Sequence, residues 1–101
     1  MSERGDASVI DRKILDAASK LGDPYKVLND TLKSYLIKRI VELTQIIRRF
    51  EKKYGVNFKE FEGRNLLDQL GHTWEVEEDY YEWDRAVTEL ERLEEILMEL
   101  V

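Results

Sequence analysis

The feature that most constrains this chain is the stretch from Pro24 to Tyr54, which contains no further glycine or proline. Asp23 offers a capping carboxylate before it, and Gly55 follows its last residue. Its main apolar positions recur at spacings of four and three, namely Leu32, Leu36, Ile40, Leu43, Ile47, Phe50 and Tyr54. The pattern predicts one long helix over residues 24–54. Its apolar stripe is wide enough to contact more than one neighbour.

A second long helix is predicted over residues 74–101, with Thr73 as its cap. Its stripe also follows helical spacing and comprises Val76, Tyr80, Trp83, Val87, Leu90, Leu93 and Leu97. Because the two long helices have comparable lengths and the segment between them contains its own short helix, we expect them to pack as an antiparallel hairpin.

Two shorter elements complete the prediction. Residues 8–21 read as a short helix capped by Ser8, with residues 1–7 disordered before it. Residues 58–70 read as a short, irregular helix that follows a cap at Asn57. The 101 residues therefore predict a single all-α domain, a long antiparallel helical hairpin with one or two short extra helices. Because such a hairpin leaves apolar surface uncovered, we expect it to form a dimeric bundle with a second copy.

Charge is distributed unevenly between the two long helices. Residues 33–53 carry seven Lys or Arg and two Glu, a net charge of +5, whereas residues 75–99 carry eleven acids and two Arg, a net charge of −9. Helices of opposite sign attract, although each exposed pair contributes little. The basic patch at residues 48–53 should therefore face the acidic helix. Together with the net charge of −6, this makes direct nucleic-acid binding an unfavoured interpretation.

Residue types with catalytic or metal-binding potential are few. The chain has no cysteine, which excludes disulfides and thiolate metal sites and favours the cytoplasm. We expect no leader and no membrane contact, since no apolar run approaches the ~20 residues of a bilayer span. His72 and the nearby acids sit on one helix and its start, whereas helical metal sites draw carboxylates from facing helices. We therefore expect no metal, no cofactor and no enzymatic activity.

Two segments together resemble a known family. The first is Phe50-Glu51-Lys52-Lys53-Tyr54-Gly55 with Phe58 and Phe61 after it, and the second is Trp74-Glu75-Val76-Glu77-Glu78-Asp79-Tyr80-Tyr81-Glu82-Trp83. Over about residues 45–97 the chain resembles the small helical antitoxins encoded beside a toxin gene in archaeal and cyanobacterial genomes. The resemblance implies a cytoplasmic protein that neutralises a cognate, basic, nuclease-like toxin by forming a stoichiometric complex.

The acidic, aromatic start of the last helix is the candidate partner-binding site. Aromatic side chains next to carboxylates suit a basic protein surface. The residues proposed for this contact are Trp74, Glu75, Glu78, Asp79, Tyr81 and Glu82. Two alternatives remain open. One is a structural or adaptor bundle that binds only itself. The other is a small all-α, metal-dependent nucleotide pyrophosphohydrolase, which the chain resembles in size and helicity.

Overall fold

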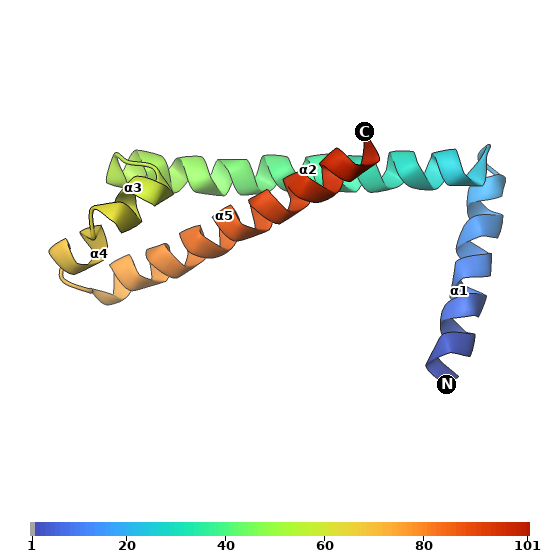
Figure 1. Ribbon diagram of the computed structural model, residues 1–101, viewed down its shortest axis with the longest axis horizontal. Helices are drawn as coiled ribbons and strands as arrows, with labels where there is room; N and C mark the ends of the chain where they lie inside the picture. Colours follow the sequence, from blue (N-terminus) through green and yellow to red (C-terminus); the bar gives the residue numbers. More distant parts are fainter. Residues whose placement is uncertain (1) are drawn as a thin grey trace. The chain divides into compact units, whose positions relative to one another are not determined.

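The computed structural model describes the backbone of residues 2–101 and the side chains of residues 11–101. Every regular element in this described part is a helix, which confirms the all-α prediction (Figure 1). The elements are α1 (Ser2–Ser19), α2 (Pro24–Tyr54), α3 (Phe58–Gly63), α4 (Leu66–Gln69) and α5 (Trp74–Leu100). The chain divides into two compact units. One is Met1–Tyr35 with Leu100, and the other is Leu36–Glu99 with Val101.

The first unit contains α1 and the beginning of α2. α1 spans Ser2–Ser19. It therefore begins before residue 8 and ends before residue 21, the two predicted bounds. Of the predicted disordered residues 1–7, Met1 lies outside the described part and the rest belong to the helix. Ser8 is consequently inside α1 and is not its cap. The sequence offers no proline to stop this helix, and Gly5 costs only about 1 kcal/mol.

α1 ends in a tightened turn. The backbone N–H groups of Lys20 and Leu21 donate to the carbonyls of Ala17 and Ala18, at 3.2 and 2.9 Å. These hydrogen bonds span three residues, as in a 3₁₀ helix, and such turns are frequent where an α-helix ends. Gly22 follows with a φ of 147°, a conformation that residues with a side chain rarely adopt. The chain therefore leaves the helix before Gly22, two residues sooner than its apolar pattern suggests.

The bounds of α2 match the sequence prediction. The Asp23 carboxylate accepts a hydrogen bond from the N–H of Tyr25 at 3.2 Å, and its carbonyl accepts one from Val27 at 2.9 Å. The helix ends where Gly55 takes a φ of 72° while donating its N–H to the Glu51 carbonyl at 2.7 Å. Glycine reaches this left-handed conformation without the clash that a Cβ would introduce. α2 therefore has a side-chain cap at its start and a glycine stop at its end.

The connection between the long helices differs from the single irregular helix predicted over residues 58–70. Asn57 caps α3 as expected, its side chain accepting from the N–H of Glu60 at 2.8 Å. Asn65 then adopts a left-handed conformation, with φ 53° and ψ 44°, and separates α3 from α4. A single left-handed residue reverses the helical path, and asparagine tolerates it better than most residues. The connection is therefore two short helices with a break between them.

The core of the second unit is aromatic. Four side chains are buried in one cluster, namely Phe50, Phe58, Phe61 and Trp83. Trp83 is completely buried and lies at its centre, with ring centroids 5.6 Å from Phe50 and 5.8 Å from Tyr54 in stacked arrangements. Burial of such a side chain contributes about 1.5–3 kcal/mol. The core therefore lies where α3 bridges the end of α2 and the beginning of α5.

The helical seam continues beyond this cluster with smaller side chains. Leu36 and Leu43 are buried on α2, as the sequence spacing predicts. On α5, Ala86 is buried, although the predicted stripe omitted it because alanine carries little apolar signal. Leu32 departs from the prediction, since it is 43 % exposed. The α5 ribbon runs back along α2 through this region (Figure 1).

Candidate partner-binding surface

One flank of the α2–α5 pair is closed by ion pairs, and we call it the paired flank. Along the series of pairs, the number of the α2 residue falls while that of the α5 residue rises, which establishes that the two helices are antiparallel. The pairs are Lys53 with Glu75 at 2.7 Å and with Asp79 at 2.5 Å, Arg49 with Glu82 at 3.3 Å, and Arg39 with Glu89 at 2.7 Å. The predicted attraction between the basic and acidic helices is therefore confirmed.

Asp79 is the most enclosed carboxylate of the paired flank, with 16 % of its side chain exposed. It accepts hydrogen bonds from the Lys53 ammonium and from the Tyr54 hydroxyl, each at 2.5 Å. Burial opposes its ionisation, but these two donors outweigh burial and lower the pKa of Asp79. Burial and the bond to Asp79 raise the pKa of Tyr54 to about 12. Asp79 is thus ionised and held by two groups of α2.

The six predicted partner-binding residues therefore divide into two sets. Glu75, Asp79 and Glu82 are engaged inside the chain by Lys53 and Arg49. Trp74, Glu78 and Tyr81 form no ion pair among the described residues and are exposed. The sequence could not separate these sets because opposite charges alone do not determine which carboxylate meets which base.

The exposed set forms what we call the outer strip, Trp74, Glu78 and Tyr81. At about 100° per residue, positions 74, 78 and 81 return to one side of the helix. Trp74 is 76 % exposed and Tyr81 is 60 % exposed. The Tyr81 ring also contacts the Tyr80 ring edge to face, with centroids 5.5 Å apart. Exposed aromatic side chains beside a carboxylate are suited to anchoring a protein partner.

His72 belongs to a separate polar cluster before α5. Its ring contacts the Asp68 carboxylate and also lies 3.2 Å from that of Glu77. The hydrogen bond that the ring makes to Asp68, and then the one it makes to Glu77, raise the pKa of His72. No group of three or more His, Asp or Glu residues is arranged for metal binding within the described part of the chain. The cluster thus ties the end of the α4 turn to α5.

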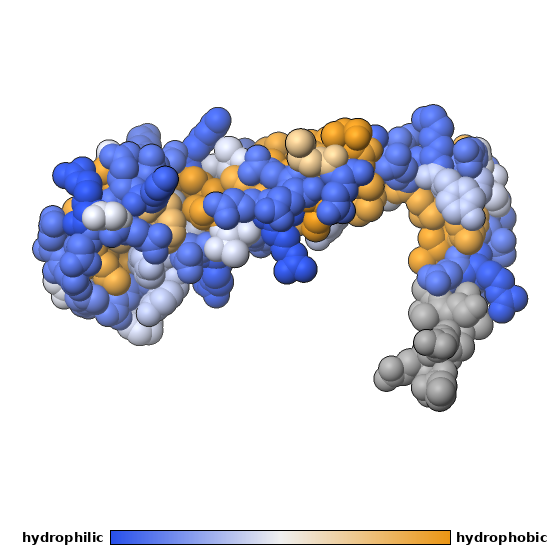
Figure 2. Space-filling view, viewed as in Figure 1, coloured by the Kyte–Doolittle hydropathy of each residue, from blue (hydrophilic) through white to orange (hydrophobic). Residues whose placement is uncertain are grey.

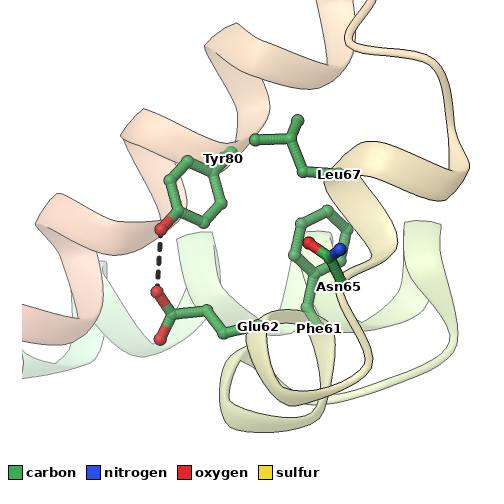
Figure 3. Close-up of a pocket in the computed structure, with 5 residues that line it drawn as sticks. All are labelled: Phe61, Glu62, Asn65, Leu67 and Tyr80. Carbon is green, nitrogen blue, oxygen red and sulfur yellow. Dashed lines mark hydrogen bonds between the residues drawn. The ribbon is translucent and has the colours of Figure 1, made fainter.

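A small hollow lies between α3, α4 and α5 (Figure 3). Its volume is about 140 Å³, and Phe61, Glu62, Asn65, Leu67 and Tyr80 line it. The Tyr80 hydroxyl donates to the Glu62 carboxylate at 2.7 Å, which together with burial raises the pKa of Tyr80 to about 12. Ligand pockets are usually ~300–1,000 Å³. This hollow is therefore too small for a typical substrate, and its polar bond holds α3 against α5.

Apolar surface is also exposed on α2. Ile37 and Val41 lie one helical turn apart, and each is 51 % exposed. Patches of apolar surface interrupt the charged surface around the long helices (Figure 2). Apolar surface that the hairpin was expected to leave uncovered is thus present at these two positions. It provides a second surface that another protein chain could cover.

These features define an all-α protein whose second unit is an antiparallel helical hairpin with an aromatic core. The chain belongs to the family described as the uncharacterized protein MJ0235 family, whose match covers residues 12–101. No curated protein and no solved structure matches the chain. Among the described residues, no helix is long and apolar enough to cross a membrane.

Proposed function

We propose that this chain is a cytoplasmic protein-binding module that acts without catalysis by forming a stoichiometric complex with a basic protein. The observation that carries the proposal is the outer strip. Trp74 and Tyr81 are exposed on either side of Glu78, on a helix in which the neighbouring acids Glu75, Asp79 and Glu82 are paired with α2. Large exposed aromatic side chains are costly to leave in water and typical of the energetic centres of interfaces.

The proposed partner is a nuclease-like toxin, and the mode of action is that of the small helical antitoxins. A protein that binds RNA presents clustered Lys and Arg to the phosphates. The acidic α5 would cover such a surface, while Trp74 and Tyr81 would occupy apolar gaps between its charges. Long-range attraction between opposite charges would also increase the association rate.

Self-association is the second candidate, and the exposure of Ile37 and Val41 favours it. A homodimer that covers these residues would be compatible with binding a toxin, since the outer strip lies on a different helix. A homo-oligomer that binds nothing else would instead make the chain a structural or adaptor bundle.

The test is co-expression with the product of the neighbouring gene in the source genome, with growth rescue as the readout. We expect the wild-type chain to restore growth. The double variant Trp74→Ala/Tyr81→Ala should fail to restore it while remaining folded. Met98→Ala is the matched control, because Met98 is an exposed apolar residue outside the outer strip.

Three results would contradict the proposal. One is a neighbouring product that is not toxic, and another is rescue that survives loss of both aromatic side chains. The third is magnesium-dependent hydrolysis of nucleotides by the purified chain, which would favour the pyrophosphohydrolase alternative.

A further inference from the structure

The flank of the hairpin that carries Val87 and Glu91 differs from the paired flank. Two hollows of about 310 and 290 Å³ lie along it. They adjoin, because Phe58, Lys59, Val87 and Glu91 line both. We call the combined depression the acidic groove. It belongs entirely to the second unit.

The floor of the acidic groove is apolar. Phe58 of α3 and Val87 of α5 line both hollows, and Ile47 and Leu90 extend the floor along the two long helices. Phe58 belongs to the aromatic core and Val87 packs against it, so the floor rests on the close-packed core of the unit. An apolar floor on a packed core is suited to accept side chains from a partner without rearranging.

The rim of the acidic groove is negative. Five carboxylates line it against one cation, Lys59, and they are Glu51, Glu62, Asp84, Glu91 and Glu94. None of the five has an ion-pair partner within 4.0 Å among the described residues, in contrast to the acids of the paired flank. Only Glu62 has a further bond, from the Tyr80 hydroxyl. Like charges around an apolar trough repel one another, and a cationic ligand would relieve that repulsion.

We propose that the acidic groove binds a cationic amphipathic helix of a partner protein. The apolar stripe of such a helix would cover Ile47, Phe58 and Val87, and Lys or Arg residues on either side of the stripe would meet the carboxylates. This is the arrangement of helix-in-groove recognition, in which apolar anchors recur at helical spacing. The charge of the rim selects the occupant: an acidic or neutral helix would meet the floor but leave the carboxylates unpaired and partly desolvated.

The acidic groove rests on the proposed function and would give its basic partner a second contact. The two surfaces can be separated experimentally. Val87 follows Tyr81 by six residues, which places it roughly 120° away around α5 at about 100° per residue. Substitutions in the outer strip therefore leave the acidic groove in place, and the reverse also holds.

The experiment measures the fluorescence anisotropy of a labelled synthetic helix titrated with the full chain. The probe is a peptide of about five helical turns, with leucine along one stripe and lysine at the remaining positions. A second peptide with glutamate in place of each lysine controls for apolar attraction. We expect the lysine peptide to bind and the glutamate peptide to bind at least about ten-fold more weakly.

Two charge-reversed variants locate the binding site. Glu91→Lys/Glu94→Lys changes the rim, and we expect it to weaken lysine-peptide binding about ten-fold or more. Glu95→Lys/Glu99→Lys makes the same change in net charge at exposed positions that line neither hollow, and should weaken binding by only about two-fold. Circular dichroism checks that both variants keep their helices.

Equal weakening by the two variants, or no binding of the lysine peptide, would overturn the inference. If Glu91→Lys/Glu94→Lys instead changed the mass of the chain alone in light scattering, the occupant would be a second copy, and the inference would also fail. Neither failure would affect the proposed function, which depends on Trp74 and Tyr81. Loss of rescue with intact peptide binding would identify the outer strip as a separate contact.

Discussion

The two flanks of the α2–α5 hairpin use the same kind of residue in different ways. On the paired flank, carboxylates of α5 meet Lys53, Arg49 and Arg39 across the helices. Along the acidic groove, Glu91 and Glu94 border an apolar floor and form no ion pair among the described residues. The acids of α5 therefore do not act alike. Some pair with bases of α2 across the hairpin, whereas those along the acidic groove stay unpaired within the described part of the chain.

The largest effect should come from the core beneath both flanks. Trp83→Ala removes the completely buried ring at the centre of the aromatic cluster and leaves a cavity there. We expect a loss of about 3–5 kcal/mol in the free energy of unfolding, measured by urea denaturation. Tyr81→Ala is the control, because its ring is mostly exposed and should cost less than about 1 kcal/mol. Similar losses for both would mean that Trp83 is not the central support.

A second substitution at Trp83 takes account of its indole N–H. Its indole N–H is buried and has no hydrogen-bond partner within the described part of the chain. Trp83→Phe removes this unsatisfied donor along with part of the ring. Because an unpartnered buried donor costs about 1–3 kcal/mol, we expect Trp83→Phe to destabilise the unit far less than Trp83→Ala. Equal destabilisation by the two substitutions would contradict this expectation, because both remove the unsatisfied donor and only Trp83→Ala also removes the whole ring.

A smaller effect should follow from breaking the most enclosed pair of the paired flank. Asp79→Ala leaves Lys53 and the Tyr54 hydroxyl without their shared acceptor, and we expect a loss of about 1–2 kcal/mol at neutral pH. The folded-state pKa of Asp79 is lower than its ordinary value of 3.8, so this contribution is present above that value and is lost as the pH falls through the folded pKa. The difference between wild type and variant should therefore shrink in acid. If the difference in stability between wild type and Asp79→Ala stayed constant as the pH fell below the folded-state pKa, Asp79 would not be the ionised acceptor of these two bonds.

Removing an exposed charge should change the stability of the fold in opposite directions on the two flanks. Arg49→Gln removes an exposed cross-helix pair and should cost a few tenths of a kcal/mol. Glu91→Gln removes a rim carboxylate among like charges and should be neutral or slightly stabilising. Thermal denaturation at low and high salt measures both, and salt should reduce the two effects. Destabilisation by Glu91→Gln equal to that by Arg49→Gln would mean that the flanks do not differ.

The smallest predicted effect concerns the turn that precedes α5. Contact with Asp68 and Glu77 raises the pKa of His72 above its ordinary value of 6.5. The stability that these contacts add to the folded state is therefore complete below pH 6.5 and is lost as the pH rises through the folded-state pKa of His72. His72→Gln should remove this pH dependence while leaving stability in the alkaline range unchanged. Titration of the ring by NMR provides the check, and an unshifted or lowered pKa would contradict it.

Local signals allowed much of this fold to be predicted from the sequence. Asp23, Asn57 and Thr73 each cap the helix that they were expected to cap, because a capping side chain bonds to backbone only two or three residues away. The bounds of α2 and the start of α5 follow from these caps and from Gly55. The break at Asn65 escaped prediction, since asparagine tolerates a left-handed conformation but does not require it.

The candidate surface was less predictable because it depends on tertiary pairing. The sequence identified an acidic, aromatic segment. It could not predict that Asp79 bonds to Lys53 and Tyr54 whereas Glu78 stays exposed. The acidic groove could not be predicted either. It depends on Phe58 of a short helix approaching Val87 of a long one, a contact between residues far apart in the chain.

We propose that this chain acts by binding a basic protein through the surface of α5. The most direct test mixes the purified chain with the purified product of the neighbouring gene and measures mass by size exclusion with light scattering. We expect one complex of defined stoichiometry, which is lost in Trp74→Ala/Tyr81→Ala and weakened by salt. Separate elution of the two proteins, with the chain alone as a homo-oligomer of unchanged mass, would contradict it.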